Sequence, residues 1–122
     1  MDDYFIGIDI GGTKIAGAVV TARGKIVSRV KMDSPAKSNP KNIYKCLVDL
    51  IDELRLSSNI SISRIKGIGL GVPGIIDTRT NFILAAPNIN LTGFPLSAQL
   101  KKKYPVKVNA KAKNYVLEKL TL

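Results

Sequence analysis

The polar side chains of Asp9, Thr13 and Lys14 surround a Gly11-Gly12 pair in an otherwise apolar stretch near the N-terminus. Backbone N–H groups of Gly11, Gly12 and Thr13, together with the Thr13 hydroxyl, could cradle a phosphate, and Lys14 would add a positive charge. Asp9 could hold a hydrated Mg²⁺, because this ion prefers one or two carboxylates and keeps several waters. The stretch therefore predicts a phosphate and Mg²⁺ site. An ordinary tight hairpin with a capping Asp is the alternative that the same residues allow.

Two apolar runs, residues 4–10 and 14–21, flank the glycine pair and predict neighbouring antiparallel strands. We expect the Gly-Gly turn to use positive φ angles, which glycine adopts at the least cost. The stretch is not a Walker loop, because the G-x-x-x-x-G-K-[ST] spacing is absent and a strand follows the glycines where a P-loop opens a helix.

A second glycine-rich run lies in the middle of the chain. It reads Gly67-Ile68-Gly69-Leu70-Gly71-Val72-Pro73-Gly74 and continues through Ile76-Asp77 to Ala86-Pro87-Asn88-Ile89-Asn90-Leu91. This run has the order and spacing of the G-x-G-x-P-G and A-P-N-L segments of the ROK family. The stretch from Gly7 to Lys14 resembles the first phosphate-binding motif of that family, which comprises sugar kinases and related repressors of the actin, Hsp70 and hexokinase superfamily. The resemblance covers nearly the whole chain and implies the N-terminal lobe of a two-lobed protein.

The resemblance implies a reaction, two cofactors and two sets of site residues. The reaction is transfer of the γ-phosphoryl group of ATP to a hydroxyl of a sugar, a hexose as in glucokinases, with Mg²⁺. The residues implied to face phosphate and Mg²⁺ are Asp9, Gly11, Gly12, Thr13 and Lys14. Those implied to line the sugar pocket are Gly74, through its backbone, and Asn88, through its amide. For Asn88, an Asx-type turn after Pro87 is the local alternative.

The chain departs from the family pattern near its C-terminus. After a Pro-Val-x-Val strand the family has an E-N-D-A-N-like segment, whose Asp is the catalytic base. Without a gap, Lys111 takes the position of that base, and Ala110 takes the position of the sugar-contacting Asn that precedes it. A lysine acts as a base only where burial lowers its pKa by several units, and nothing nearby in the sequence indicates this. No catalytic residue is therefore assigned.

The chain also ends before the second phosphate motif, the adenosine site and the E-x-G-H sugar motif of the family. We therefore expect the chain to be inactive as a kinase by itself. The alternative function is a non-catalytic sugar- or phosphate-sensing module related to ROK repressors. We also expect exposed apolar surface to favour self-association, for example as a homodimer.

Composition narrows the functional classes. Cys46 is the only cysteine and histidine is absent, so the chain cannot supply four structural zinc ligands, and we expect no zinc. The net charge of +10 would attract phosphate-bearing partners, although scattered solvated lysines suffice to explain it. Nucleic acid is weakly supported as a partner, because no helix-turn-helix precedes the first strand. The acidic start and the lack of any 18-residue apolar run predict no membrane span and a cytoplasmic location.

The pattern of elements predicts an α/β fold, a ribonuclease-H-like (actin-like ATPase) lobe with a mixed five-stranded sheet in the order βββαβαβα. We expect one domain over residues 1–122, divisible into a 1–108 core and a 112–122 terminal helix. The predicted strands span residues 4–10, 14–21, 25–32, 65–72 and 106–108, with a short extended segment at 82–85. The predicted helices span residues 41 to about 56, 96–103, and from about 112 onward.

Overall fold

The computed structural model describes residues 3–112. In chain order its elements are β1 (Tyr4–Ile10), β2 (Lys14–Thr21), β3 (Ile26–Asp33), α1 (Pro40–Ser58), the short 3₁₀ helix η1 (Ile62–Arg64), β4 (Ile65–Val72), β5 (Ile75–Asp77), β6 (Phe82–Ala85), α2 (Leu96–Lys103) and β7 (Lys107–Ala112).

The main sheet has five strands in the order β3-β2-β1-β4-β7. β2 pairs antiparallel with both β1 and β3, whereas β4 runs parallel to both β1 and β7. The short turns between the first three strands permit only antiparallel pairing, and the connections through α1 and α2 return the chain in the parallel direction. The prediction of a mixed five-stranded α/β sheet is confirmed.

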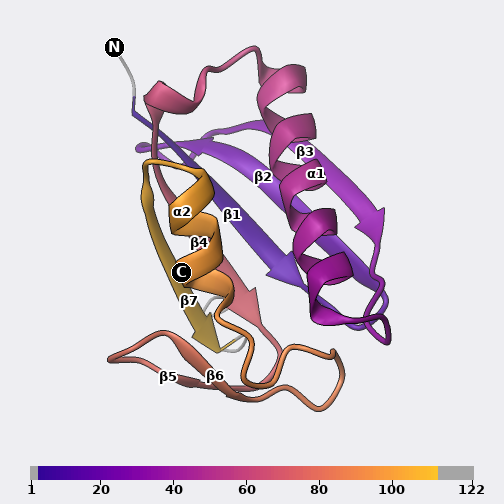
Figure 1. Cartoon of the computed structure of the whole chain (residues 1–122). Coiled ribbons are helices and arrows are strands. Elements are labelled where there is room, and N and C mark those ends of the chain that lie inside the picture. The colour runs from indigo at the N-terminus through magenta and orange to yellow at the C-terminus, as the bar shows by residue number, and fades with distance from the viewer. Residues whose placement is uncertain (1–2, 113–122) are drawn as a thin grey trace.

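The two faces of the sheet carry side chains of different size. On one face, β1 contributes Ile6, Ile8 and Ile10, none of which is more than 3% exposed. Figure 1 shows α1 and α2 in front of the sheet, with α1 against β2 and β3 and α2 against β7. On the other face, Gly7 lies beside Gly69, and a Cβ added at either would meet no atom of the described chain within 4 Å. The apolar core therefore lies between the sheet and the two helices.

Capping residues set both ends of helix α1. The Asn39 side chain accepts a hydrogen bond of 2.9 Å from the Asn42 N–H, and Pro40 occupies the first turn, where a missing N–H is tolerated. The helix ends at Ser58, two residues later than predicted. Asn59 is the C-cap, and its left-handed backbone, at φ 55°, terminates the helix. One face of the helix is apolar and buried, through Ile43, Leu47, Leu50, Ile51 and Leu54.

A second, two-stranded sheet follows β4. The sequence predicts only an extended segment at 82–85 here, whereas the structure pairs β5 with β6 as an antiparallel hairpin. Asn81, at φ 63°, holds this hairpin against the rest of the fold. Its side-chain oxygen accepts hydrogen bonds from the Ala110 N–H and the Ser97 hydroxyl, and its amide donates to Asn109 over 3.0 Å. These contacts satisfy an edge N–H of β7, which would otherwise offer a template for another strand.

Strand β7 is longer than predicted. Its pairing with β4 continues through Lys111 beside Gly71 and Ala112 beside Val72. The strand predicted at residues 106–108 therefore continues to Ala112, where the terminal helix is expected to begin, because ladder hydrogen bonds to β4 hold these residues extended. The remainder of the predicted terminal helix lies outside the described residues.

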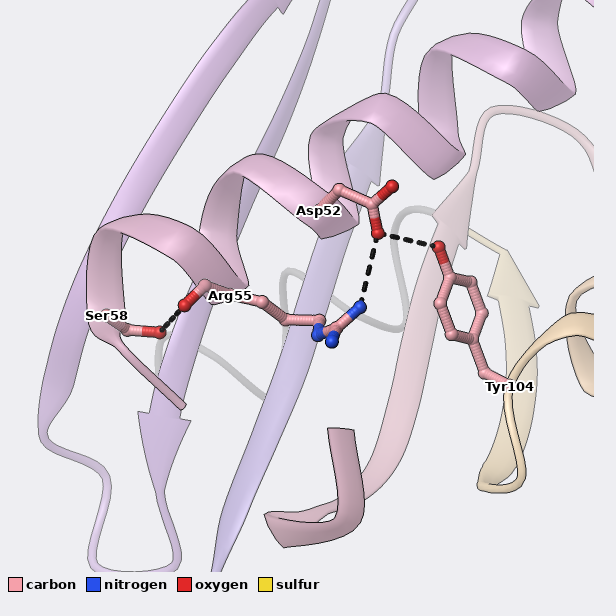
Figure 2. A network of polar contacts seen from close by, with 4 residues as sticks. All are labelled: Asp52, Arg55, Ser58 and Tyr104. Carbon is pink, nitrogen blue, oxygen red and sulfur yellow. Dashed lines mark hydrogen bonds and ion pairs between the residues drawn. The ribbon is translucent and has the colours of Figure 1, made fainter. Parts of the chain in front are cut away.

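A polar network ties α1 to the segment after α2 (Figure 2). The Tyr104 hydroxyl donates to the Asp52 carboxylate over 3.3 Å, and the Arg55 guanidinium approaches the same oxygen at 3.3 Å. Burial, with the Asp52 charge as a second cause, raises the pKa of Tyr104 above its ordinary value of 10.0. Tyr104 therefore serves as a neutral donor that joins the two helical regions.

Over residues 3–112, no helix is both long enough and apolar enough to cross a bilayer.

Candidate functional site

The bend between β1 and β2 is a tight turn closed by its own backbone. The Gly11 N–H donates to the Lys14 carbonyl over 2.9 Å, so this amide is already used. Among the described glycines, positive φ occurs only at Gly24 and Gly93, so the prediction of positive φ at Gly11-Gly12 is wrong. The amides of Gly12 and Thr13 make no hydrogen bond within residues 3–112. These two N–H groups, and not three, are the donors that the bend could offer to a phosphate.

The reason for glycine at position 12 is a close contact with the second motif. A Cβ added to Gly12 would lie 3.1 Å from the Asn88 carbonyl oxygen and 3.6 Å from the Asn88 Cβ. Any larger residue would push the two loops apart. The fold thus brings together the bend implied to bind phosphate and the loop implied to bind sugar, although 75 residues separate them in the sequence.

The loop around Asn88 is anchored by its neighbours. The Asn90 N–H donates to the Ala36 carbonyl over 2.8 Å, and its side chain donates to the Ser38 carbonyl over 3.0 Å. The Asn88 side chain is exposed and makes no hydrogen bond to any described residue, so the Asx-type turn considered from the sequence is not formed. The amide of Asn88 is therefore held in place by the loop while its donor and acceptor remain open to a ligand.

Gly74 has a packing role. A Cβ at this position would lie 1.9 Å from the Ala85 carbonyl oxygen and 3.0 Å from the Ala86 Cα. The start of β5 and the end of β6 can therefore pair only because residue 74 has no side chain. This contact sets the path of the chain toward Asn88, and a direct contact between Gly74 and sugar stays a prediction.

Asp9 and Lys111 lie in one row across the sheet. Asp9 of β1 is in register with Gly71 of β4, which is in register with Lys111 of β7. Since two strand spacings separate them, their Cα atoms are about 10 Å apart, with no side chain on the strand between. All three strands point toward the end of the sheet where the β5–β6 hairpin lies (Figure 1). This row places a carboxylate and an ammonium group, both partly buried, at the same end as Gly12.

Lys14 has a partner that the sequence analysis missed. Its ammonium group forms an ion pair with the Asp33 carboxylate, at the register position opposite Lys14 on β3. This hydrogen bond, and then the charge of Lys14, lowers the pKa of Asp33 from its ordinary value of 3.8. The register of the β2–β3 hairpin was the signal that could have found this pair. To bind a phosphate, the Lys14 ammonium group must leave the Asp33 carboxylate.

The metal-binding capacity of the site is limited. No group of three His, Cys, Asp or Glu side chains gathers within the described chain. A single carboxylate such as Asp9 fits Mg²⁺, which completes its shell with water and phosphate oxygens, better than an ion that needs a full protein cage. Cys46 lies on α1, and burial raises the pKa of its thiol. It is therefore not an activated nucleophile.

Known proteins resemble this chain in sequence and in fold. A glucokinase of Halalkalibacterium halodurans is 36% identical over 110 residues, which cover 88% of this chain and 33% of that protein. A xylose repressor of Caldicellulosiruptor bescii is 28% identical over 84% of this chain and 26% of its own length. The crystal structure of a ROK family glucokinase from Streptomyces griseus in complex with glucose and AMPPNP superposes with a TM-score of 0.78, at 28% identity, over 89% of this chain and 33% of that one.

The chain thus spans about a third of the length of the curated relatives it matches. The model of the ROK family matches residues 5–115, a range that includes the glycine bend, the Asn88 loop and β7. Both a glucokinase and a xylose repressor are similar to this chain over more than four fifths of its length. The chain belongs to the ROK family.

Proposed function

We propose that the chain is the N-terminal lobe of a ROK-type, ATP-dependent hexose kinase and contributes phosphate, Mg²⁺ and sugar contacts. The observation that carries the proposal is the contact of Gly12 with Asn88, because it joins a phosphate-type bend to a polar loop. The glucokinase of Streptomyces griseus, with a similar fold, was solved with glucose and AMPPNP.

Each side chain has a distinct role in this proposal. The amides of Gly12 and Thr13 donate to phosphate oxygens, and Lys14 supplies positive charge after leaving Asp33. Asp9 holds Mg²⁺ through water, and that ion would neutralise charge on the phosphates. The Asn88 amide orients a sugar hydroxyl with its donor and acceptor, and Gly74 keeps the Asn88 loop close to the bend.

We propose that the 122-residue chain has no kinase activity by itself. Lys111 stands where a carboxylate is expected to accept the proton of the sugar hydroxyl, and a lysine ammonium group has no free electron pair for it. Phosphoryl transfer also requires nucleotide and acceptor to be held in line. A coupled ATP/hexose assay should show no turnover above that of an Asp9→Ala, Lys14→Ala double variant. Turnover above that control would contradict the inactivity.

Ligand binding tests the lobe assignment separately from catalysis. In ¹⁵N NMR titrations, glucose should shift the amide signals around Asn88 and Gly74, and AMPPNP with Mg²⁺ should shift those of Gly12 and Thr13. The variant Asn88→Ala should lose the glucose response. The matched variant Asn90→Ala, two residues away, should keep it, because Asn90 bonds the Ser38 carbonyl. If glucose still shifts the amide signals in Asn88→Ala, the proposed sugar site at Asn88 is wrong.

The second candidate is a non-catalytic sugar- or phosphate-sensing module, which Lys111 favours and which matches the similarity to a repressor. It predicts the same titrations together with a complete lack of ATP turnover in any longer polypeptide that contains this lobe. We also propose self-association, supported by the exposed apolar side chains of Ile75, Phe82 and Leu84 on the β5–β6 hairpin. Size-exclusion chromatography that gives a monomer at high concentration would contradict it.

A further inference from the structure

A hollow of about 520 Å³ opens at the amino ends of β4 and β7, and we call it the lysine groove. Its charged lining residues are Lys66 of β4, Lys101 of α2 and Lys107 of β7, and no carboxylate lines it. The rest of the lining is apolar or neutral: Ile62, Ser63, Ile65, Tyr104, Pro105 and Val106. Three elements that are distant in sequence thus direct the same charge toward one concave surface.

These lysines have no counter-charge in the described chain. Within residues 3–112, Lys14 pairs with Asp33 and Arg55 pairs with Asp52, whereas no lysine of the groove forms an ion pair. The nearest network, shown in Figure 2, turns the Tyr104 hydroxyl toward Asp52 on α1 and leaves the Tyr104 ring as part of the groove wall. The groove is therefore cationic with no internal compensation.

Helix α2 explains only part of this arrangement. Lys101, Lys102 and Lys103 occupy its last turn, where cations complement the negative end of the helix dipole. Lys66 and Lys107 lie on strands, where no such dipole exists. The convergence of strand and helix lysines on one hollow has no structural explanation, and it points to an anionic ligand.

The lysine groove is distinct from the Gly12 bend. The bend follows the carboxyl end of β1, whereas the groove lies at the amino ends of β4 and β7, which run parallel to β1 (Figure 1). Because β4 has eight residues, the two places are about 25 Å apart at roughly 3.3 Å per residue. One ligand cannot bridge both.

We propose that the lysine groove binds an anion made of linked phosphates, such as a short inorganic polyphosphate or the triphosphate of a nucleotide. Lysine ammonium groups are compact charges that bind phosphate oxygens, and the Ser63 hydroxyl can donate a further hydrogen bond. Three lysines match an anion with three or more charges, whereas a single phosphate monoester carries about two. Duplex DNA fits less well, because its affinity comes from many phosphate contacts, on the order of 6–10, spread over a longer surface.

The test is a titration of the ¹⁵N-labelled 122-residue chain with sodium tripolyphosphate, and with ATP in a parallel arm. We expect tripolyphosphate to shift the amide signals of Lys66 and Lys107. The amide signal of Gly12 should not follow the same saturation curve. If ATP shifts the same amide signals, the groove accepts the triphosphate of a nucleotide. If only tripolyphosphate shifts them, the groove binds inorganic polyphosphate. Both results support the proposal.

Two triple variants separate the groove from general charge. Lys66→Ala/Lys101→Ala/Lys107→Ala should weaken tripolyphosphate binding about tenfold or more, as expected for the loss of several charge-assisted contacts. The matched Lys25→Ala/Lys37→Ala/Lys45→Ala variant removes the same charge from exposed positions elsewhere and should bind within about twofold of the parent, since distant charges are screened.

Three results would overturn the proposal: equal weakening in both triple variants, no binding at millimolar tripolyphosphate, or tighter binding of a duplex oligonucleotide to the same amides. All six lysines are exposed, so folding is checked by circular dichroism and should be unchanged. Since no residue of the groove belongs to the proposed kinase lobe site, failure of either proposal leaves the other standing.

Discussion

Gly74→Ala should destabilise the fold, because an added Cβ would collide with backbone atoms of β6. The added Cβ would lie 1.9 Å from the Ala85 carbonyl oxygen, and it reaches ordinary contact only at 3.4 Å or more, so β5 and β6 must separate by about 1.5 Å. The obstacle is backbone on both sides, and no rotamer change relieves it. Overpacking of this kind costs about 1–3 kcal/mol, and loss of a pairing hydrogen bond adds about 1 kcal/mol.

We therefore expect a loss of about 3 kcal/mol in the free energy of unfolding, which corresponds to about 12 °C in Tm for a chain of this size. Urea denaturation followed by circular dichroism measures it. The matched control is Gly69→Ala on β4, where a Cβ meets nothing within 4 Å of the described chain. Gly69→Ala should be neutral or stabilising by up to about 1 kcal/mol, because alanine loses less backbone entropy on folding. Equal effects of the two substitutions, or a Gly74→Ala change below about 0.5 kcal/mol, would refute the packing role of Gly74.

Three further outcomes follow from the polar contacts. Tyr104→Phe should cost about 1 kcal/mol of unfolding free energy, because the hydrogen bond to Asp52 is lost, and an unchanged urea midpoint would contradict this. Lys14→Met should return the pKa of Asp33 upward toward 3.8 in a ¹³C NMR titration. Since the pair lowers that pKa in the folded state, its contribution to stability is present above pH 4 and is lost as pH falls through the folded value, and Lys14→Met should flatten this acid limb. Cys46, with its raised pKa, should react with a thiol reagent at pH 7 more slowly in the folded chain than in urea, and equal rates would show that burial does not protect it.

The elements of this fold were largely readable from the sequence because their signals are local. Apolar runs on both sides of a glycine pair predict β1 and β2, and the helical spacing of apolar residues from Ile43 to Leu54 predicts α1. Short turns and long crossovers then dictate which strands pair antiparallel and which pair parallel. The family assignment could also be made from two glycine motifs, since their order and spacing along the chain need no coordinates.

The contacts that shape the candidate site depend on tertiary structure. The approach of Gly12 to Asn88, the packing of Gly74 on Ala85 and the hold of Asn81 on β7 join residues that are far apart in sequence, and no local pattern announces them. The same holds for the lysine groove, whose three charges look scattered along the chain. Local sequence determines which elements form because hydrogen bonds and apolar periodicity act between near neighbours. Packing of the sheet against its helices decides which loops meet, and therefore where a ligand can be held.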